Sequence, residues 1–263
     1  MEPVFLYPSV SAKLVMSKRM EVIANNLANA DTDGFKKDFP VFGSVTSPFS
    51  KISSMGQSED GTGGTSVIPI PTFAMLSELT INFKQGSIKT TDAPLDMAIE
   101  GKGFFQVQAP SGIRYTRNGS FTLSNEGVLV NKHGLPVLGI GGPITLPNGI
   151  VNVDDTGRIS VKEGKSGTPT EIDTLALVDI ADPSLLQKTG DDLFVLMEGE
   201  ATPIIEGDGR VRQGALEGSN VDPVQEMVAM IFAIRQYEAA QKAIQTAEEI
   251  DVNKVNKVGK LEQ

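Results

Sequence analysis

The chain has 263 residues, 40% of them hydrophobic, which is enough for one large domain or two small ones around an ordinary core. It contains no cysteine, which excludes disulfides, thiolate nucleophiles and sulfur-rich metal sites. The formal net charge of −10 argues against a nucleic-acid partner, because such proteins usually concentrate lysine and arginine on one face.

The first predicted element is an amphipathic helix over residues 8–29. Asparagine is unfavourable inside a helix because its amide competes for backbone hydrogen bonds, so Asn25, Asn26 and Asn29 need a specific reason to be there. The sequence Asp-Thr-Asp-Gly at 31–34 then ends the helix. Apolar residues recur at spacings of three and four and predict a narrow face that packs on another helix: Met16, Met20, Ile23, Leu27 and Ala30.

The next segment is predicted to be an extended or mobile connector. Residues 43–66 are rich in serine and glycine and show no hydrophobic period, so they are not expected to build a core.

Short apolar runs separated by turn residues predict a β body over residues 79–215, a meander or a small barrel. The strongest hairpin signal is Asn118-Gly119, because both residue types tolerate the positive φ of a type I′ turn. Further turns are predicted at residues 147–149, 155–157 and 207–209, each ending in glycine.

The last predicted element is a long helix that runs to about Val258 without glycine or proline. Asn220 or Asp222 is expected to cap it, with Pro223 at its first position and Glu226 in its first turn. Its apolar face is again narrow: Met227, Met230, Ile234, Tyr237, Ile244, Ala247, Val255 and Val258. The fold class is therefore predicted to be α+β, with helical ends and a central, mainly antiparallel β domain.

The sequence predicts no catalytic, cofactor or metal site. The only histidine, His133, lies in a predicted turn, so neither a Ser-His-Asp triad nor a multi-histidine metal site can be assembled. The aspartate pairs at 154–155 and 191–192 lie beside turns, and the carboxylates at 248–251 are interpreted as a solvated helix face. No small-molecule substrate is indicated.

Three blocks in order resemble the bacterial flagellar rod and hook family of axial proteins. The first is "ANNLAN" followed by "DGFK", the second is "APLDMAIEGKGFFQV" with "RYTRNGSFTL" and "LVNKHGLPVLG", and the third is "GALEGSNVDPVQEMVAMI". Together the matches extend from about residue 10 to residue 258. Within the family the compact body points to a rod protein, most similar to a proximal and next to a distal rod member.

The resemblance implies a structural, non-enzymatic subunit of the flagellar rod that transmits torque. The terminal helices are expected to form a coiled-coil layer in which the asparagine amides bond between packed helices. Implied partners are copies of itself, other rod proteins, adjacent hook or ring components and the flagellar type III export apparatus. The expected assembly interface comprises Met16, Met20, Ile23, Asn25, Asn26, Leu27, Asn29, Gly34, Phe35, Met227, Met230, Ile234, Tyr237, Ile244, Val255 and Val258.

The expected location is the periplasmic part of the basal body. Residues 1–20 lack the features of a cleaved secretory signal, which fits type III export, and no run is long enough to span a membrane. The expected divisions are an N-terminal helix and motif (1–42), a connector (43–80), the β domain (81–215) and a C-terminal helix (216–263).

Two hypotheses that assign the protein to other functional classes stay open. One is a β-domain binding module with helical oligomerisation ends, which requires a concave apolar pocket within residues 81–215. The other is a carbohydrate-active enzyme, which requires two neighbouring carboxylates in a cleft.

Overall fold

The computed structural model describes residues 6–46, 72–164, 167–197, 204–206 and 209–258. The chain divides into two compact units, each made from separate stretches of sequence. We call residues 1–27, 38–80 and 223–263 the helical unit, and residues 28–37 and 81–222 the β unit. The sequence grouped residues 28–37 with the N-terminal helix, whereas this division groups them with the β unit.

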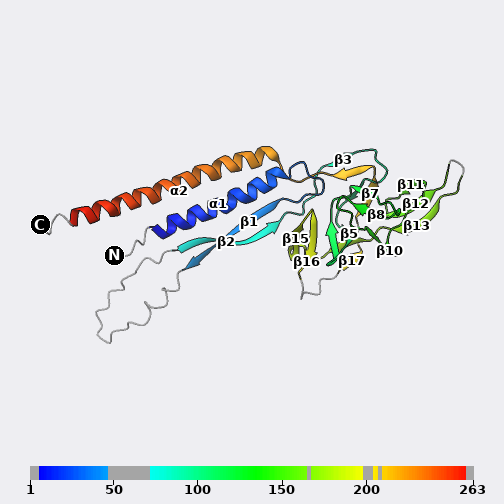
Figure 1. Ribbon diagram of the computed structural model, residues 1–263, viewed down its shortest axis with the longest axis horizontal. Coiled ribbons are helices and arrows are strands. Elements are labelled where there is room, and N and C mark those ends of the chain that lie inside the picture. The colour runs from blue at the N-terminus through cyan, green and yellow to red at the C-terminus, as the bar shows by residue number, and fades with distance from the viewer. Residues whose placement is uncertain (1–5, 47–71, 165–166, 198–203, 207–208, 259–263) are drawn as a thin grey trace, which may run out of the picture. The chain divides into compact units, whose positions relative to one another are not determined.

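The described residues of the helical unit form two helices and a pair of strands: α1 (Leu6–Ala28), β1 (Asp38–Thr46), β2 (Thr72–Ile81) and α2 (Pro223–Val258). Both predicted helices are confirmed, including the start of α2 at Pro223. Figure 1 shows α1 and α2 running side by side in opposite directions, and the Lys13 ammonium lies 5.3 Å from the centre of the Tyr237 ring. The pairing of β1 with β2 was not predicted, because serine and glycine between them obscured the strand pattern. Residues 47–71 of the predicted connector lie outside the described residues.

The β unit consists of short strands that pair antiparallel, and its largest sheet has the order β15-β16-β6-β5-β14-β17. This sheet is open, with edges at β15 and β17, so the structure does not support a closed barrel. The strands and one short 3-10 helix are β3 (Ile88–Thr90), β4 (Met97–Glu100), β5 (Phe104–Ala109), β6 (Gly112–Thr116), β7 (Phe121–Leu123), β8 (Leu129–Asn131), β9 (Leu138–Gly139), β10 (Gly142–Pro143), β11 (Ile150–Val153), β12 (Arg158–Lys162), β13 (Thr170–Thr174), β14 (Leu177–Ile180), η2 (Pro183–Leu185), β15 (Leu186–Gly190), β16 (Leu193–Leu196), β17 (Ile204–Glu206), β18 (Arg210–Gln213) and β19 (Ala215–Glu217).

Strand β5 supplies side chains to two hydrophobic clusters, because neighbouring strand residues point to opposite faces. Phe105 packs in the larger cluster with residues of β4, β7 and β8, and its ring meets Phe121 edge-on at 5.2 Å. Phe104 packs in the second cluster, where its ring lies 5.6 Å from Phe83 and 5.9 Å from Phe194. One strand thus joins the two parts of the core.

The predicted hairpin at Asn118-Gly119 is wrong. Neither residue has a positive φ, β6 pairs with β5 and β16, and β7 pairs with β8. Gly119 is required for a different reason: a Cβ there would lie 1.6 Å from the Met97 carbonyl oxygen. The turn at Asp155-Thr156-Gly157 does join a hairpin, β11 to β12, and Gly157 has a φ of 84°.

We expect Gly119→Ala to destabilise the β unit by about 3 kcal/mol or more, because the added methyl group would collide with backbone rather than with a movable side chain. The matched control is Gly134→Ala, where φ is 77° but nothing lies within 4 Å of the new atom. It should cost only about 1 kcal/mol. Urea unfolding of both variants checks this, and equal losses would contradict the steric explanation.

Candidate functional site

The three sequence blocks that carry the resemblance meet at one buried cluster of charges in the β unit. The Lys36 ammonium, from "DGFK", lies 2.5 Å from one carboxylate oxygen of Glu217, from "GALEG". The Arg117 guanidinium, from "RYTRNG", lies 3.3 Å from the other oxygen. The side chains of Lys36 and Glu217 are completely buried. We call Lys36, Arg117 and Glu217 the charge triad.

Two polar atoms of the charge triad have further hydrogen-bond partners. Lys36 Nζ also donates to the Lys84 carbonyl at 2.9 Å, and the Gly86 amide donates to Glu217 Oε1 at 2.9 Å. The Arg117 guanidinium lies 5.1 Å from the centre of the Phe104 ring, while its Nε has no hydrogen-bond partner. These contacts offset part of the cost of removing three charges from water.

Burial also sets the electrostatics of the charge triad. Desolvation lowers the pKa of Lys36 below its ordinary value, and the attraction of Glu217 opposes that shift. Desolvation likewise lowers the pKa of Arg117, again opposed by Glu217. Two cations therefore share the carboxylate of Glu217, and Asp179 adds a smaller attraction to Arg117.

The residues around Lys36 hold the "DGFK" segment in the β unit. Gly34 has a φ of 73°, donates its amide to the Glu217 carbonyl at 2.6 Å, and has no room for a Cβ, which would lie 2.4 Å from the Asn118 nitrogen. Phe35 is buried, and the Lys188 ammonium lies 4.0 Å from the centre of its ring. Gly34 and Phe35, predicted for the assembly interface, thus have packing roles within their own chain.

Asn220, from the third block, joins two backbone segments instead of using its side chain only as a helix cap. Its Nδ2 donates to the carbonyls of Asn82 at 2.7 Å and Lys84 at 2.9 Å. Its Oδ1 accepts from the Lys37 amide at 2.8 Å. The end of the "DGFK" segment and the chain entering β3 are therefore held by one amide.

In the helical unit, Asn26 plays a comparable part. This side chain is buried; its Oδ1 accepts from the Asp38 amide at 2.9 Å and its Nδ2 donates to the Asp38 carbonyl at 2.9 Å. The same nitrogen lies 3.4 Å from Glu226 Oε2, in the first turn of α2. Asn26 thus links α1 to the start of β1 and to α2, which explains an asparagine inside the helix.

The other two asparagines are less buried. Asn25 Nδ2 lies 3.5 Å from the Asp38 carboxylate, and Asn29 accepts from the Thr32 hydroxyl at 3.2 Å just after α1 ends. Bonds from any of these amides to another subunit stay a prediction.

The structure places the remaining predicted interface residues at different depths. Ile23 is buried, whereas Met16, Met20, Leu27, Met230, Tyr237 and Ile244 are half-buried. Met227 and Ile234 are exposed, and the side chains of Val255 and Val258 lie outside the described part. The sequence analysis missed the buried Val15, Val22 and Ala233, because a face defined by one residue per turn underestimates the width of the contact.

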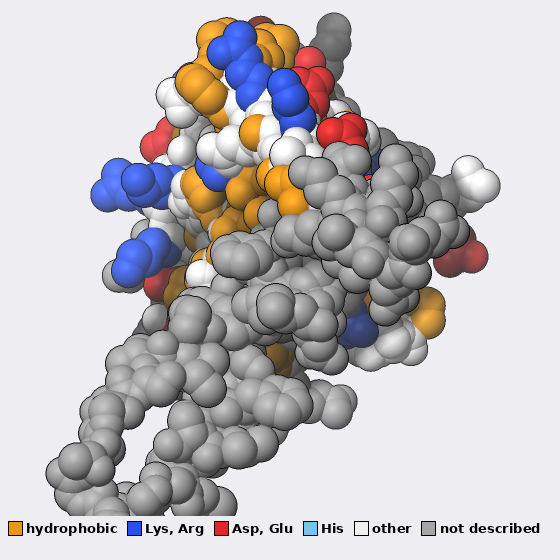
Figure 2. All heavy atoms as spheres, turned by 90° about the vertical axis from the view of Figure 1, so that its left-hand side faces the viewer, with side chains coloured by type: hydrophobic (Ala, Val, Ile, Leu, Met, Phe, Trp, Pro, Cys, Tyr) orange, Lys and Arg blue, Asp and Glu red, His pale blue; other side chains and the backbone are white. Residues whose placement is uncertain are grey.

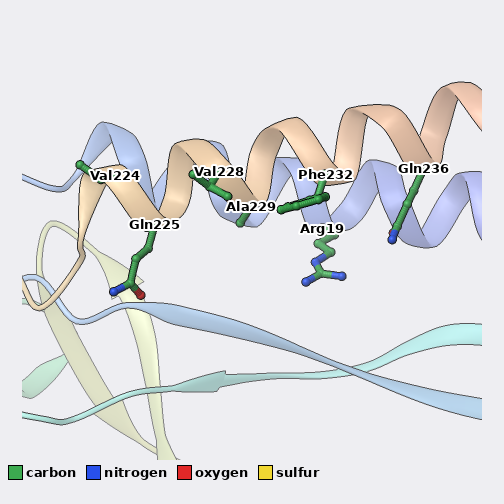
Figure 3. A pocket seen from close by; sticks show the side chains of 7 residues that line it. All are labelled: Arg19, Val224, Gln225, Val228, Ala229, Phe232 and Gln236. Carbon is green, nitrogen blue, oxygen red and sulfur yellow. The ribbon is translucent and has the colours of Figure 1, made fainter.

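A groove of about 460 Å³ runs along the first turns of α2 in the helical unit. Its lining combines apolar side chains with a cation from α1, as Figure 3 shows: Arg19, Val224, Gln225, Val228, Ala229, Phe232 and Gln236. Hydrophobic side chains also reach the surface among lysine and arginine side chains in Figure 2.

Other kinds of site have no support among the described residues. No cluster of three or more histidine or acidic side chains with the geometry to hold a metal ion occurs there. Within the same part of the chain, no helix has the length and apolar character needed to cross a membrane. Asp192 accepts from Lys132 at 2.5 Å and from Asn118 at 3.4 Å, so this member of a candidate carboxylate pair holds two chain segments together.

Comparison with known families finds three matching models along the chain. They are described as flagella basal body rod protein (residues 6–36), flagellar hook protein FlgE/F/G D1 domain (98–161) and flagellar basal body rod FlgEFG protein C-terminal (212–253). The charge triad draws one residue from each matched region.

Similar proteins match along most of their length. The flagellar basal-body rod protein FlgF of Caulobacter vibrioides is 34% identical, over 97% of this chain and 98% of that protein. The flagellar basal-body rod protein FlgG of Buchnera aphidicola subsp. Schizaphis graminum is 36% identical, over 88% of this chain and 90% of its own. FlgG of Bacillus subtilis is 31% identical, over 95% and 97%.

Substitutions of Glu217 and of Lys36 in the charge triad should lower the free energy of unfolding by different amounts. Glu217→Gln leaves two buried cations without a carboxylate and should cost about 3 to 5 kcal/mol. Lys36→Met leaves Glu217 paired with Arg117 and should cost less, although both changes break the same contact. Urea unfolding followed by near-ultraviolet circular dichroism gives the two free energies.

The control for this comparison is Arg212→Met. Arg212 lies 3.2 Å from Glu100, but both side chains are about half exposed, so the loss should stay below about 1 kcal/mol. A larger loss for Lys36→Met than for Glu217→Gln would contradict the charge balance described above.

Asn26→Ala should destabilise the helical unit by about 1 to 3 kcal/mol, because the partly buried amide and carbonyl of Asp38 both lose their partner atoms on that side chain. Lys18→Ala, on an exposed turn of the same helix, is the control. Hydrogen exchange at the Asp38 amide in the unassembled chain measures the effect. Unchanged protection of that amide would show that the Asn26 bonds do not hold β1 in place.

Proposed function

Because this chain belongs to the family of flagellar basal-body rod proteins, we propose that it is a structural subunit of the bacterial flagellar rod. In this role it transmits torque through packing between subunits rather than through chemistry. The observation that supports this role is the surface of α2, whose first turns expose large apolar side chains on more than one side. A helix of that composition is normally covered, so assembly is the expected state.

The terminal helices supply the assembly contacts in this proposal, with neighbouring copies forming a coiled-coil layer. The exposed Met227 and Ile234 would face other subunits directly, whereas Asn26 and Phe35 would act by holding their own chain in shape. This is a narrower role than the sequence suggested for Asn26 and Phe35.

We assign the chain first to the proximal rod, as FlgF, with the distal rod, as FlgG, as the alternative. The compact body favours the first assignment, whereas relatives named FlgG with similar identity and coverage keep the second open. A small peptide tag detected by labelled antibody on isolated basal bodies separates them. Label near the inner-membrane ring supports the proximal assignment, and label near the hook overturns it.

The proposed partners follow from this position. They are copies of the same chain, other rod proteins, adjacent hook or ring components, and the flagellar type III export apparatus. Export through that apparatus would deliver the chain to the periplasmic rod without cleavage. Mass spectrometry of isolated rods should then recover a peptide beginning in residues 1–13, and its consistent absence would contradict uncleaved export.

Removing residues 242–263 should leave the β unit folded and prevent assembly. The β unit contains none of those residues, whereas α2 loses its second half. Circular dichroism of the purified variant tests folding, and its recovery in isolated basal bodies tests assembly. Lys242→Ala, with the helix intact, is the control. A truncated chain that restored swimming would rule out a required role for this helix.

Hydrogen exchange on the unassembled chain should separate the two units. Helices α1 and α2 should exchange faster than the β unit, because each buries little apolar surface in a single copy. The boundary should lie near residue 28, so the Phe35 and Lys36 amides should exchange as slowly as the β unit that buries their side chains. Equal protection of α2 and the β unit would contradict coupling of helix order to assembly.

A further inference from the structure

The first turns of α2 present a broad exposed apolar surface with two sides. Val224, Val228 and Phe232 follow one another at intervals of four residues and line the groove that Arg19 borders. A second set, Met227, Ile231 and Ile234, is also exposed and recurs at intervals of four and three. Since a helix turns by about 100° per residue, the two sets are centred about 90° apart on α2. They share a border, because Val224 and Met227, like Val228 and Ile231, are three residues apart.

The third side of α2 packs against other parts of the helical unit. Glu226 and Ala233 are buried, and Tyr237 contacts Lys13 of α1. The two apolar faces therefore flank the side that packs within the helical unit. Each copy can contact one neighbour through each face, and such unlike contacts repeat into a ring or a helical array.

Charge distinguishes the two faces. The guanidinium of Arg19 lies beside Phe232 and Gln236 at one end of the groove, as Figure 3 shows. Glu238 follows Ile234 by four residues and so extends the second face by one turn. Both side chains are exposed, and among the described residues neither forms an ion pair. Arg19 thus borders the first face and Glu238 extends the second, while the exposed Arg235, four residues after Ile231, lies between the two faces.

The two faces also match in length. The groove extends from Val224 to Gln236, a distance of about 18 Å along a helix, and the face from Met227 to Glu238 extends about 16 Å. An apolar helix face with anchors at these intervals is the usual occupant of such a groove.

We propose that the groove beside Arg19 binds the second face of α2, residues 227–238, from a neighbouring copy of this chain. Ile234 of the neighbour then lies against Phe232, and Glu238 of the neighbour pairs with Arg19. This contact rests on the proposed rod function and specifies which surfaces of the terminal helices meet. In this register the two helices are offset by two residues, about 3 Å along the helix axis.

The absence of cysteine allows a direct test by cross-linking. Phe232→Cys and Ile234→Cys are combined in one chain that is the only source of the subunit, and isolated basal bodies are oxidised with copper phenanthroline. The two positions point to different sides of one helix, so they cannot bridge within a copy. We expect a ladder of dimers, trimers and larger species, because every copy carries both faces. Neither single variant should give it.

The competing occupant is α1 of a neighbour, which exposes Leu14. The control chain therefore combines Phe232→Cys with Leu14→Cys. A ladder from this control, or no ladder from the first chain although it is present in the basal bodies, overturns the proposed contact while leaving the rod function intact. Absence of the unmodified parent chain from basal bodies would instead overturn the rod function and this contact together.

Charge exchange gives a second test that does not depend on cysteine. Arg19→Glu and Glu238→Arg should each reduce the number of completed rods about tenfold or more, because like charges then meet in every repeat. Combining both changes should restore rods to within about twofold of the parent chain. Lys18→Glu, on another side of α1, is the control and should have little effect. A double variant no better than the single variants would overturn the pairing.

Discussion

The shared carboxylate of Glu217 is the interaction on which the arrangement of the β unit depends. It neutralises Lys36 and Arg117, which arrive from segments far apart in the sequence. A buried ion pair adds little net stability compared with apolar packing, yet leaving one of its members unpaired is costly. Its effect is therefore mainly on specificity: any docking of the "DGFK" segment that misplaces Lys36 leaves charges buried without a partner.

Close contacts also fix the segment that follows α1 and the segment that precedes α2. Gly34 approaches the backbone of Asn118 so closely that no other residue fits, and Asn220 fixes the chain just before α2 begins. The segment that follows α1 and the segment that precedes α2 are thus both held within the β unit.

Within the helical unit, the polar side chain of Asn26 again positions neighbouring segments, while much of the apolar surface of α2 stays exposed. Asn26 holds β1 and the first turn of α2 through three contacts. Beyond that turn α2 buries few side chains and exposes several large apolar ones, such as Phe232 and Ile231. The contrast fits a subunit in which single-chain contacts set geometry and contacts between copies supply most of the apolar burial.

The sequence alone determined the features that depend on local chemistry. The uninterrupted helical pattern up to Val258, the proline at the start of α2 and the alternation of short strands all report backbone preferences that neighbouring residues decide. The ordered blocks likewise identified the family. Within the candidate site, the sequence could single out Asn26 as unusual, because an asparagine in a helix conflicts with local preference.

Only the tertiary structure decided which distant groups meet. Nothing near Lys36 in the sequence indicates that it is buried, because its partner Glu217 is brought in from the other end of the chain. Asn118-Gly119 satisfied every local rule for a hairpin. However, the Met97 carbonyl occupies the space beside Gly119, and β7 pairs with β8. Tertiary packing likewise decided the pairing of β1 with β2 and which sides of α2 stay exposed. Local preferences limit what each segment can form, and long-range packing selects the contacts that it makes.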